Sequence, residues 1–281
     1  MNINRDIATT CYEYLYTIIE FYSNEVALNK KFIITEKDIK FRFPNITETL
    51  TEWGNIELND FILLLNFINN NALPKYLSQN NLFNKNLNYS DFVASVQLNF
   101  FNAETIKNKY QDLEISYNIY NSLFGKVLIA SISDYVCLIY FINEDEEALK
   151  ILKKYFLKAQ FIQKSKNIHL EALEKINNYT NDTPIQVLVN ASDLQEKVWK
   201  QLVLLPYKNI FSYGEIAKQI KEEMAVRAIS TAIGKNPIAV LIPCHRIIQA
   251  SGKTGEFMWG QSRKKALLIH EILSVKKSLS I

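Results

Sequence analysis

A cysteine, a histidine and an arginine follow one another directly after an apolar run in the stretch VLIPCHRIIQ, residues 240–249. A cysteine is a nucleophile only as the thiolate, so a base must take its proton. His245 is a candidate base for Cys244, and a base usually needs an acceptor that orients its ring. Glu271 is the candidate for that third role because the helix predicted around it could fold back on the site.

The residues alone leave other interpretations open. An isolated cysteine after a core strand is more often buried and inert than reactive. His245 could be a structural histidine, and Arg246 could form an ion pair or brace the backbone. A cysteine hydrolase would also use a Cys–His pair, but it needs an oxyanion hole that no motif in the sequence indicates.

The bulk composition limits the class of protein. The chain has 281 residues, enough for two or three domains, and its 48% hydrophobic and 22% charged residues fit a globular protein. The apolar runs are shorter than the roughly 18 residues of a membrane-spanning helix, and the N-terminus lacks a signal-peptide pattern. We therefore expect a cytoplasmic protein. Three cysteines without a CxxC pair, and three histidines, predict no zinc site, disulfide framework or cofactor.

Positive charge is concentrated in the last third of the chain. Residues 191–281 hold 14 Lys and Arg against 7 Asp and Glu, in a chain whose net charge is +3. A basic segment on a mildly acidic body is one signature of nucleic-acid binding.

Three segments differ in their hydrophobic pattern. Residues 1–110 have a helical period, with a turn-rich stretch at 69–88, and 191–281 are again helical. Residues 111–190 combine three β-rich runs with two helices and a final strand, which predicts a small α+β unit.

Two short helices in the basic segment predict a helix-turn-helix. Ser212 and Glu215 form a capping box at the start of the first of these, and Asp193 is the expected N-cap of the helix before it. Arg227 lies near the start of the second, where such motifs enter a groove of DNA.

The motif IPCHRII resembles the active-site signature of the O6-alkylguanine-DNA alkyltransferases, or methylated-DNA–protein-cysteine methyltransferases. The stretches KVWKQLVLLPYKNIFSYGEIA, AVRAISTAIGKNPIAVLIPCHRII, SGKTGEFMWG and RKKALLIHEI occur in the family's order and spacing. The resemblance covers nearly all of 191–281, and 111–190 resembles the family's ribonuclease-like N-terminal subdomain. It implies an α+β multi-domain fold: a small α/β subdomain and a mainly helical, winged-helix-like domain that binds DNA and carries the active site.

The resemblance implies single-turnover DNA repair, in which a flipped O6-alkylguanine gives its alkyl group permanently to Cys244. It leaves O4-alkylthymine open as a second substrate. His245 would act as the base through a bridging water, and Glu271 would orient it. Tyr213 would rotate the 3′ phosphate and protonate the leaving guanine, while Asn236 would brace the turn beside the active site.

The resemblance also implies how DNA is held. Arg227 would take the place of the flipped base, and Ser230, on the same helix, stands near the DNA where the family often has glycine. The guanine pocket would be lined by four residues, Pro243, Phe257, Met258 and Trp259. The implied partner is double-stranded DNA containing O6-alkylguanine, with no membrane and no metal, and the protein would be a monomer.

Two stretches depart from the family pattern. Lys208 and Asn209 stand where Gly-Lys is common, and KEEMAVRA lacks the usual Gly/Pro turn before Arg227. The second departure places Glu222 and Glu223 near the expected phosphates.

The first segment faintly resembles another module. LTEWGNIELNDFILLL, residues 50–65, resembles the AraC-type helix-turn-helix region fused to alkyltransferases of the adaptive-response (Ada) type. Because the neighbouring stretches NITETL and NYSDFVASV are acidic or neutral, we expect a degenerate region without specific promoter binding. Every residue implied in transfer lies after 190, so we expect deletion of 1–110 to leave transfer largely intact. The main alternative is a transcription regulator or damage-recognition protein without transfer activity, against which the intact PCHR motif argues.

Overall fold

A computed structural model describes residues 13–24, 33–54, 56–70, 96–178 and 183–273. The chain forms two units, each built from separated stretches of sequence. We call Tyr89–Leu205 with Ala217–Cys244 the sheet unit, and Met1–Asn88 with Pro206–Ile216 and His245–Ile281 the helical unit. These units cut across the three segments of the sequence analysis, because the last segment contributes to both.

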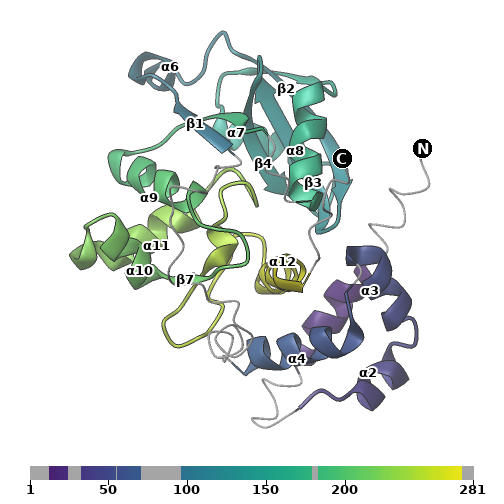
Figure 1. The fold of residues 1–281 in the computed structure, drawn as a ribbon. Coiled ribbons are helices and arrows are strands. Elements are labelled where there is room, and N and C mark those ends of the chain that lie inside the picture. The colour runs from purple at the N-terminus through teal and green to yellow at the C-terminus, as the bar shows by residue number, and fades with distance from the viewer. Residues whose placement is uncertain (1–12, 25–32, 55, 71–95, 179–182, 274–281) are drawn as a thin grey trace. The chain divides into compact units, whose positions relative to one another are not determined.

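A six-stranded mixed sheet lies at the centre of the sheet unit, in the order β1-β6-β4-β3-β2-β5 (Figure 1). The predicted β-rich runs form an antiparallel meander of β2 (Glu114–Ser122), β3 (Gly125–Ile132) and β4 (Tyr135–Phe141). Three further strands pair in parallel with their neighbours: β6 (Ile185–Val189) with β4, β1 (Val96–Phe100) with β6, and β5 (Gln160–Gln163) with β2. The α+β expectation is therefore confirmed.

Two of these strands were absent from the sequence prediction. β1 falls in the segment predicted as helical, and β5 begins at Gln160, shortly after the helix that ends at Tyr155. Each is short, and each is held in place by a partner strand distant in sequence, so the local pattern carries little signal for it. A short helix, α6 (Ala103–Lys107), follows β1.

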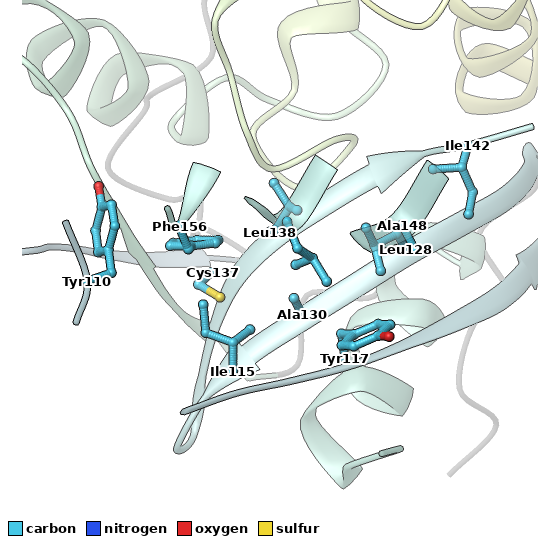
Figure 2. Packing of buried hydrophobic residues seen from close by; sticks show 11 residues of the cluster. Tyr110, Ile115, Tyr117, Leu128, Ala130, Cys137, Leu138, Ile142, Ala148 and Phe156 are labelled. Atoms are coloured by element: carbon cyan, nitrogen blue, oxygen red, sulfur yellow. The ribbon is translucent and has the colours of Figure 1, made fainter. Parts of the chain in front are cut away.

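Helices cover both faces of the sheet. α8 (Asn167–Asn178) packs on β2, β3, β4 and β6. α7 (Glu147–Tyr155) contributes Ala148 and Leu152 to a buried cluster with Leu128, Ala130 and Leu138 of the sheet (Figure 2). Successive residues of a strand point to opposite faces, so Ser131 lies on the face covered by α8.

The remainder of the sheet unit carries the second helix of the predicted helix-turn-helix. α9 (Asp193–Val203) packs on α11 (Val226–Gly234), and Trp199 Nε1 donates a hydrogen bond to the Ala232 carbonyl at 3.0 Å. The predicted N-cap of α9 is wrong. Ser192 caps it in a capping box with Gln195, and Asp193 is the first helical residue, where its charge suits the helix dipole.

Most of the helical unit is made of helices from the two ends of the chain. Residues 13–24 are helical, followed by α2 (Glu36–Arg42), α3 (Ile46–Gly54) and α4 (Leu58–Asn69). The C-terminal helix α12 (Gln261–Leu273) packs against α4. The helical period of the first segment is confirmed for its described residues up to 70, whereas β1 interrupts it near its end. The predicted loop at 69–88 lies, beyond residue 70, outside the described residues.

Between these ends the chain forms the elements around the Cys-His-Arg motif. β7 (Phe211–Ser212) pairs in parallel with β8 (Ile247–Ile248), and the short 3₁₀ helix η3 (Cys244–Arg246) precedes β8. α10 (Tyr213–Gln219) begins with the predicted capping box: Glu215 N donates to Ser212 Oγ at 3.2 Å, and Ser212 N donates to Glu215 Oε2 at 2.7 Å. A 3₁₀ turn, η2 (Glu223–Ala225), precedes α11.

In the part of the chain that the structure describes, no helix is both long enough and apolar enough to cross a bilayer.

The buried His169 makes the stability of the sheet unit depend on pH. His169 Nε2 lies 2.8 Å from Ser131 Oγ, and burial lowers the pKa of His169 from 6.5 to about 4. As the pH falls from 6.5 towards 4, the unfolded chain binds a proton that the folded state excludes, so the free energy of unfolding should decrease. Denaturant titrations across this range measure the decrease, and a nuclear magnetic resonance titration should place the His169 midpoint near 4. A midpoint near 6.5 would contradict the assignment.

Candidate active site

One buried asparagine ties together the turn that leads to Cys244. Asn236 Nδ2 donates to the carbonyls of Ile238 and Ile242 at 3.1 and 2.8 Å and lies 3.2 Å from Cys244 Sγ. Asn236 Oδ1 accepts from Ile238 N at 2.9 Å. A single amide therefore links the start of the turn, its end and the thiol.

The same turn is anchored to the sheet and is locally strained. Ile139 of β4 donates to the Pro237 carbonyl and accepts from Ala239 N, each at 3.0 Å. Val240 has φ +66°, a left-handed conformation that a β-branched side chain disfavours. Pro243 is buried and follows this residue by three positions. The anchoring bonds and Asn236 hold a backbone shape that Val240 would not adopt by itself.

In the helical unit, His245 and Glu271 form a fully buried pair. His245 Nε2 lies 2.8 Å from Glu271 Oε2. Burial lowers the pKa of His245 below its ordinary value, although the hydrogen bond and the charge of Glu271 act in the opposite direction. The imidazole is therefore neutral at pH 7. A carboxylate only accepts hydrogen bonds, so the proton resides on Nε2 and Nδ1 carries a lone pair. This is the tautomer that a general base requires.

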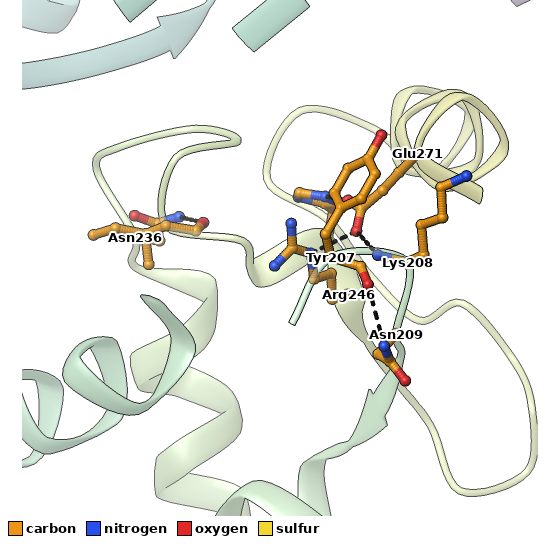
Figure 3. Close-up of polar contacts among 8 residues, drawn as sticks. Tyr207, Lys208, Asn209, Asn236, Arg246 and Glu271 are labelled. Atoms are coloured by element: carbon orange, nitrogen blue, oxygen red, sulfur yellow. Dashed lines mark hydrogen bonds and ion pairs between the residues drawn. The ribbon is translucent and has the colours of Figure 1, made fainter. Parts of the chain in front are cut away.

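The charge of Glu271 is compensated inside the helical unit. Arg246 Nε lies 2.8 Å from Glu271 Oε1, and the backbone N–H of Lys208 donates to the same oxygen at 2.8 Å (Figure 3). Burial alone raises the pKa of Glu271, but Arg246, His245 and the Lys208 N–H together bring it below its ordinary value. The carboxylate therefore stays ionised. Of the roles considered for Arg246, the ion pair is the one observed.

Lys208 is one departure from the family pattern, and its backbone conformation accounts for the glycine that is common at this position. Lys208 has φ +62°, in the left-handed region that glycine adopts without strain. The family's usual glycine fits this conformation, whereas lysine holds it at some conformational cost. Asn209 Nδ2 donates to the Tyr207 carbonyl at 3.1 Å and so supports the turn (Figure 3). The departure keeps the N–H that binds Glu271.

Lys264 is a site residue that the sequence analysis missed. Its Nζ donates to the carbonyls of Ile247 and Thr254, each at 2.5 Å, and the residue is only 1% exposed. It thereby joins the strand after η3 to the loop predicted to line the guanine pocket. The sequence offered one indication of this role: Lys264 lies seven residues before Glu271 and therefore on the same face of the helix.

Three of the four predicted pocket residues, Phe257, Met258 and Trp259, lie in that loop, whereas Pro243 belongs to the sheet unit. Phe257 and Trp259 pack edge to face with ring centroids 5.1 Å apart, and Met258 is exposed. Tyr213, half-buried at the start of α10, has its hydroxyl 3.5 Å from where a side-chain carbon on Gly255 would lie. A residue larger than glycine at 255 would therefore contact that hydroxyl.

The two predicted DNA-contact residues of α11 lie in the sheet unit. Arg227 is the second residue of that helix and is exposed, and Ser230 is half-buried. The helical unit thus holds His245, Glu271, Tyr213 and the aromatic pocket residues. The sheet unit holds Cys244, Asn236 and the exposed arginine.

Removing the charge of Glu271 should destabilise the protein. In Glu271→Gln the buried Arg246 loses its anionic partner, and breaking such a pair costs about 3–5 kcal/mol. Denaturant unfolding measures this change. The matched control is Glu222→Gln, which breaks the ion pair with Lys197 that lies exposed to solvent and so should change stability little. Equal stabilities for Glu271→Gln and Glu222→Gln would contradict the compensation described above.

Known proteins resemble this chain over the same elements. The family model for "6-O-methylguanine DNA methyltransferase, DNA binding domain" matches residues 193–272. The methylated-DNA–protein-cysteine methyltransferase of Mycolicibacterium paratuberculosis is 40% identical over 114 residues, 39% of this chain and 69% of that relative. The bifunctional transcriptional activator/DNA repair enzyme Ada of Escherichia coli is 27% identical over 172 residues, 60% of this chain and 49% of Ada.

The fold comparison agrees with the sequence comparison. The crystal structure of the O6-methylguanine methyltransferase of Mycobacterium tuberculosis superposes with a TM-score of 0.50 at 29% identity, covering 59% of this chain and 97% of that one. The chain spans 61% of the length of the Mycobacterium tuberculosis and Mycobacterium bovis methyltransferases that it matches at 43% identity. Sequence and fold together place this chain in the methylated-DNA–protein-cysteine methyltransferase family.

Proposed function

We propose that the protein repairs DNA by moving the alkyl group of O6-alkylguanine to Cys244. The observation that carries this proposal is the buried His245–Glu271 pair, neutral at the imidazole and ionised at the carboxylate. His245 follows Cys244 directly in the 3₁₀ helix η3, and the Cys244 thiol lies 3.2 Å from the side-chain amide of Asn236. The family relationship makes DNA the partner that fits this chemistry.

The proposed reaction is one in-line displacement. Cys244 gives its proton, through a water, to Nδ1 of His245, and Glu271 stabilises the imidazolium that forms. The sulfur then bonds to the alkyl carbon as the bond from that carbon to O6 breaks, and the electron pair passes to guanine. Tyr213 supplies a proton to the leaving guanine and recovers one from His245. The products are guanine and a Cys244 thioether, and because no group regenerates the thiol, each molecule reacts once.

DNA recognition is proposed to use α11. Arg227 is exposed near the N-terminal end of this helix and is suited to occupy the space of an extruded nucleotide. Lys197 forms an ion pair with Glu222 at 2.9 Å, which offsets one of the two acidic residues before α11. That pair reduces the repulsion of phosphates that the KEEMAVRA stretch would otherwise produce.

Several finer features belong to the same proposal. Residues 111–190 and 191–281 would be the two alkyltransferase subdomains, the latter winged-helix-like, and 1–110 a degenerate AraC-type region. A cytoplasmic monomer and acceptance of O4-alkylthymine remain predictions. A regulator without transfer activity is less well supported, because it has no use for a neutral base next to a cysteine.

Incubation with duplex DNA containing O6-methylguanine should add one methyl group to the peptide that carries Cys244. Mass spectrometry of the digested protein measures the adduct. Cys137 is an internal control, since it is buried in the sheet and burial raises the pKa of its thiol. Cys244→Ser should abolish the adduct. An adduct that persists in Cys244→Ser, or none in the wild type, would refute the proposed function.

Arg227→Ala should slow transfer more on duplex than on single-stranded substrate. Extruding a base from a duplex costs a few kcal/mol, so losing the side chain that fills the gap should slow the duplex reaction about tenfold or more. Single-turnover rates on both substrates measure the difference. The control is Lys235→Ala, at the C-cap of the same helix, which removes an equal charge and should affect both substrates alike. Equal slowing on both substrates in Arg227→Ala would show that Arg227 only attracts phosphates.

A further inference from the structure

The active-site helix α12 is buried on every side. All residues from Arg263 to Ile272 are buried, although this stretch contains five ionisable side chains, those of Arg263, Lys264, Lys265, His270 and Glu271. A surface helix normally keeps such residues on a face exposed to water. One face of α12, carrying Lys264 and Glu271, binds the elements around His245. A second set of polar side chains faces the N-terminal helices.

Lys265 and His270 make these second contacts. Lys265 Nζ donates to Ser23 Oγ at 2.7 Å and to Asn69 Oδ1 at 2.8 Å. His270 Nε2 lies 3.2 Å from the carbonyl oxygen of Trp53, and the two rings pack edge to face with centroids 5.1 Å apart. Ser23 comes from the helix at 13–24, Trp53 from α3 and Asn69 from the end of α4. Three N-terminal helices therefore hold α12.

These contacts must be kept in place because they bury polar groups, which are stable away from water only with their hydrogen-bond partners. Burial lowers the pKa of Lys265 to about 8 and that of His270 to about 4. The partners that bind these two side chains in the N-terminal helices, Ser23, Asn69 and the Trp53 carbonyl, are neutral, so they replace lost hydration with hydrogen bonds and add no counter-charge. If the N-terminal helices shift, α12 must either move with them or leave these groups unsatisfied.

His270 transmits this constraint to the site. It precedes Glu271 in the last turn of α12, so a rotation of that turn moves both side chains together. Glu271 in turn fixes the imidazole of His245 at 2.8 Å. Misplacing a catalytic group by about 1 Å can slow a reaction by about a hundredfold.

We propose that the helix at 13–24, α3 and α4 support the active-site helix, and that His270 and Trp53 are positioning residues that set Glu271 against His245. The inference rests on the proposed alkyl transfer. It replaces the expectation that residues 1–110 are dispensable for transfer, since their removal would expose Lys265, His270 and the apolar side chains between them. These N-terminal helices then act in the reaction without touching the substrate.

The test uses full-length variants. His270→Ala removes both the hydrogen bond to Trp53 and the ring packing, and should slow the single-turnover rate at saturating DNA about tenfold. The DNA concentration for half-maximal rate should stay within about twofold, because α12 is buried. His270→Gln keeps a nitrogen donor near the Trp53 carbonyl and should restore most of the rate. The control is Asn66→Ala, which breaks the two Asn66–Ile34 hydrogen bonds within the N-terminal helices but none to α12, and should leave the rate unchanged.

A second readout does not depend on transfer. The chain has three histidines, so a spectrum of isotope-labelled histidine assigns each ring. In His270→Ala the His245 nitrogen signals should move away from the pattern of an Nε2–H tautomer bonded to a carboxylate. Trp53→Phe, which keeps the backbone carbonyl, should shift them less and serves if His270→Ala fails to fold.

The outcomes separate the two proposals. Wild-type rates together with unchanged His245 signals in His270→Ala and Trp53→Phe would overturn the support role. So would a change confined to the half-maximal DNA concentration, which would make the N-terminal helices a DNA-binding element. If the wild type transfers no alkyl group while the His245 signals still respond to His270→Ala, the proposed function fails and the support role stands.

Discussion

The helical unit depends on one interaction, the neutralisation of the buried Glu271 carboxylate by its neighbours. An ionised carboxylate is stable away from water only when hydrogen-bond donors or cations surround it, and here His245, the ion-paired Arg246 and the Lys208 N–H do so. These three partners come from two parts of the fold: two from η3 and one from the turn before β7. The need to neutralise one charge therefore fixes the positions of α12, η3 and that turn together.

The same requirement accounts for the opening Cys-His-Arg motif. Adjacent residues in a 3₁₀ helix point in different directions, so the three side chains need not contact one another. His245 and Arg246 both reach Glu271, whereas Cys244 is held by Asn236. Residues of the motif therefore belong to two separate networks of contacts, one around Glu271 and one around Asn236. Its sequence adjacency ensures that the thiol and the base stay linked through one short piece of backbone.

The sequence predicted the parts of this structure that have local signals. Strands β2, β3 and β4, helices α7 and α11 and the Ser212–Glu215 cap follow from periodicity and capping chemistry. The site residues came from a family resemblance, because no local pattern links Cys244 to Glu271. Strand β1 was missed because its partner strand β6 is distant in the chain, and Lys264 because its hydrogen bonds to two backbone carbonyls have no sequence motif. The sequence predicted that α12 could fold back on the site, but it contained no signal for the burial of Lys265 and His270, whose partners lie in the N-terminal helices.

The interleaving of the two units has a consequence for synthesis of the chain. The contact between Lys265 and Ser23 joins residues 242 positions apart, and the first and last stretches of sequence share one unit. Contacts of such separation form slowly because a long loop must close first. During translation the N-terminal helices leave the ribosome long before α12 is made. The apolar side chains that pack on α12 therefore stay without that partner until synthesis is complete. The six-stranded sheet can form during that interval, because its strands all lie between residues 96 and 189.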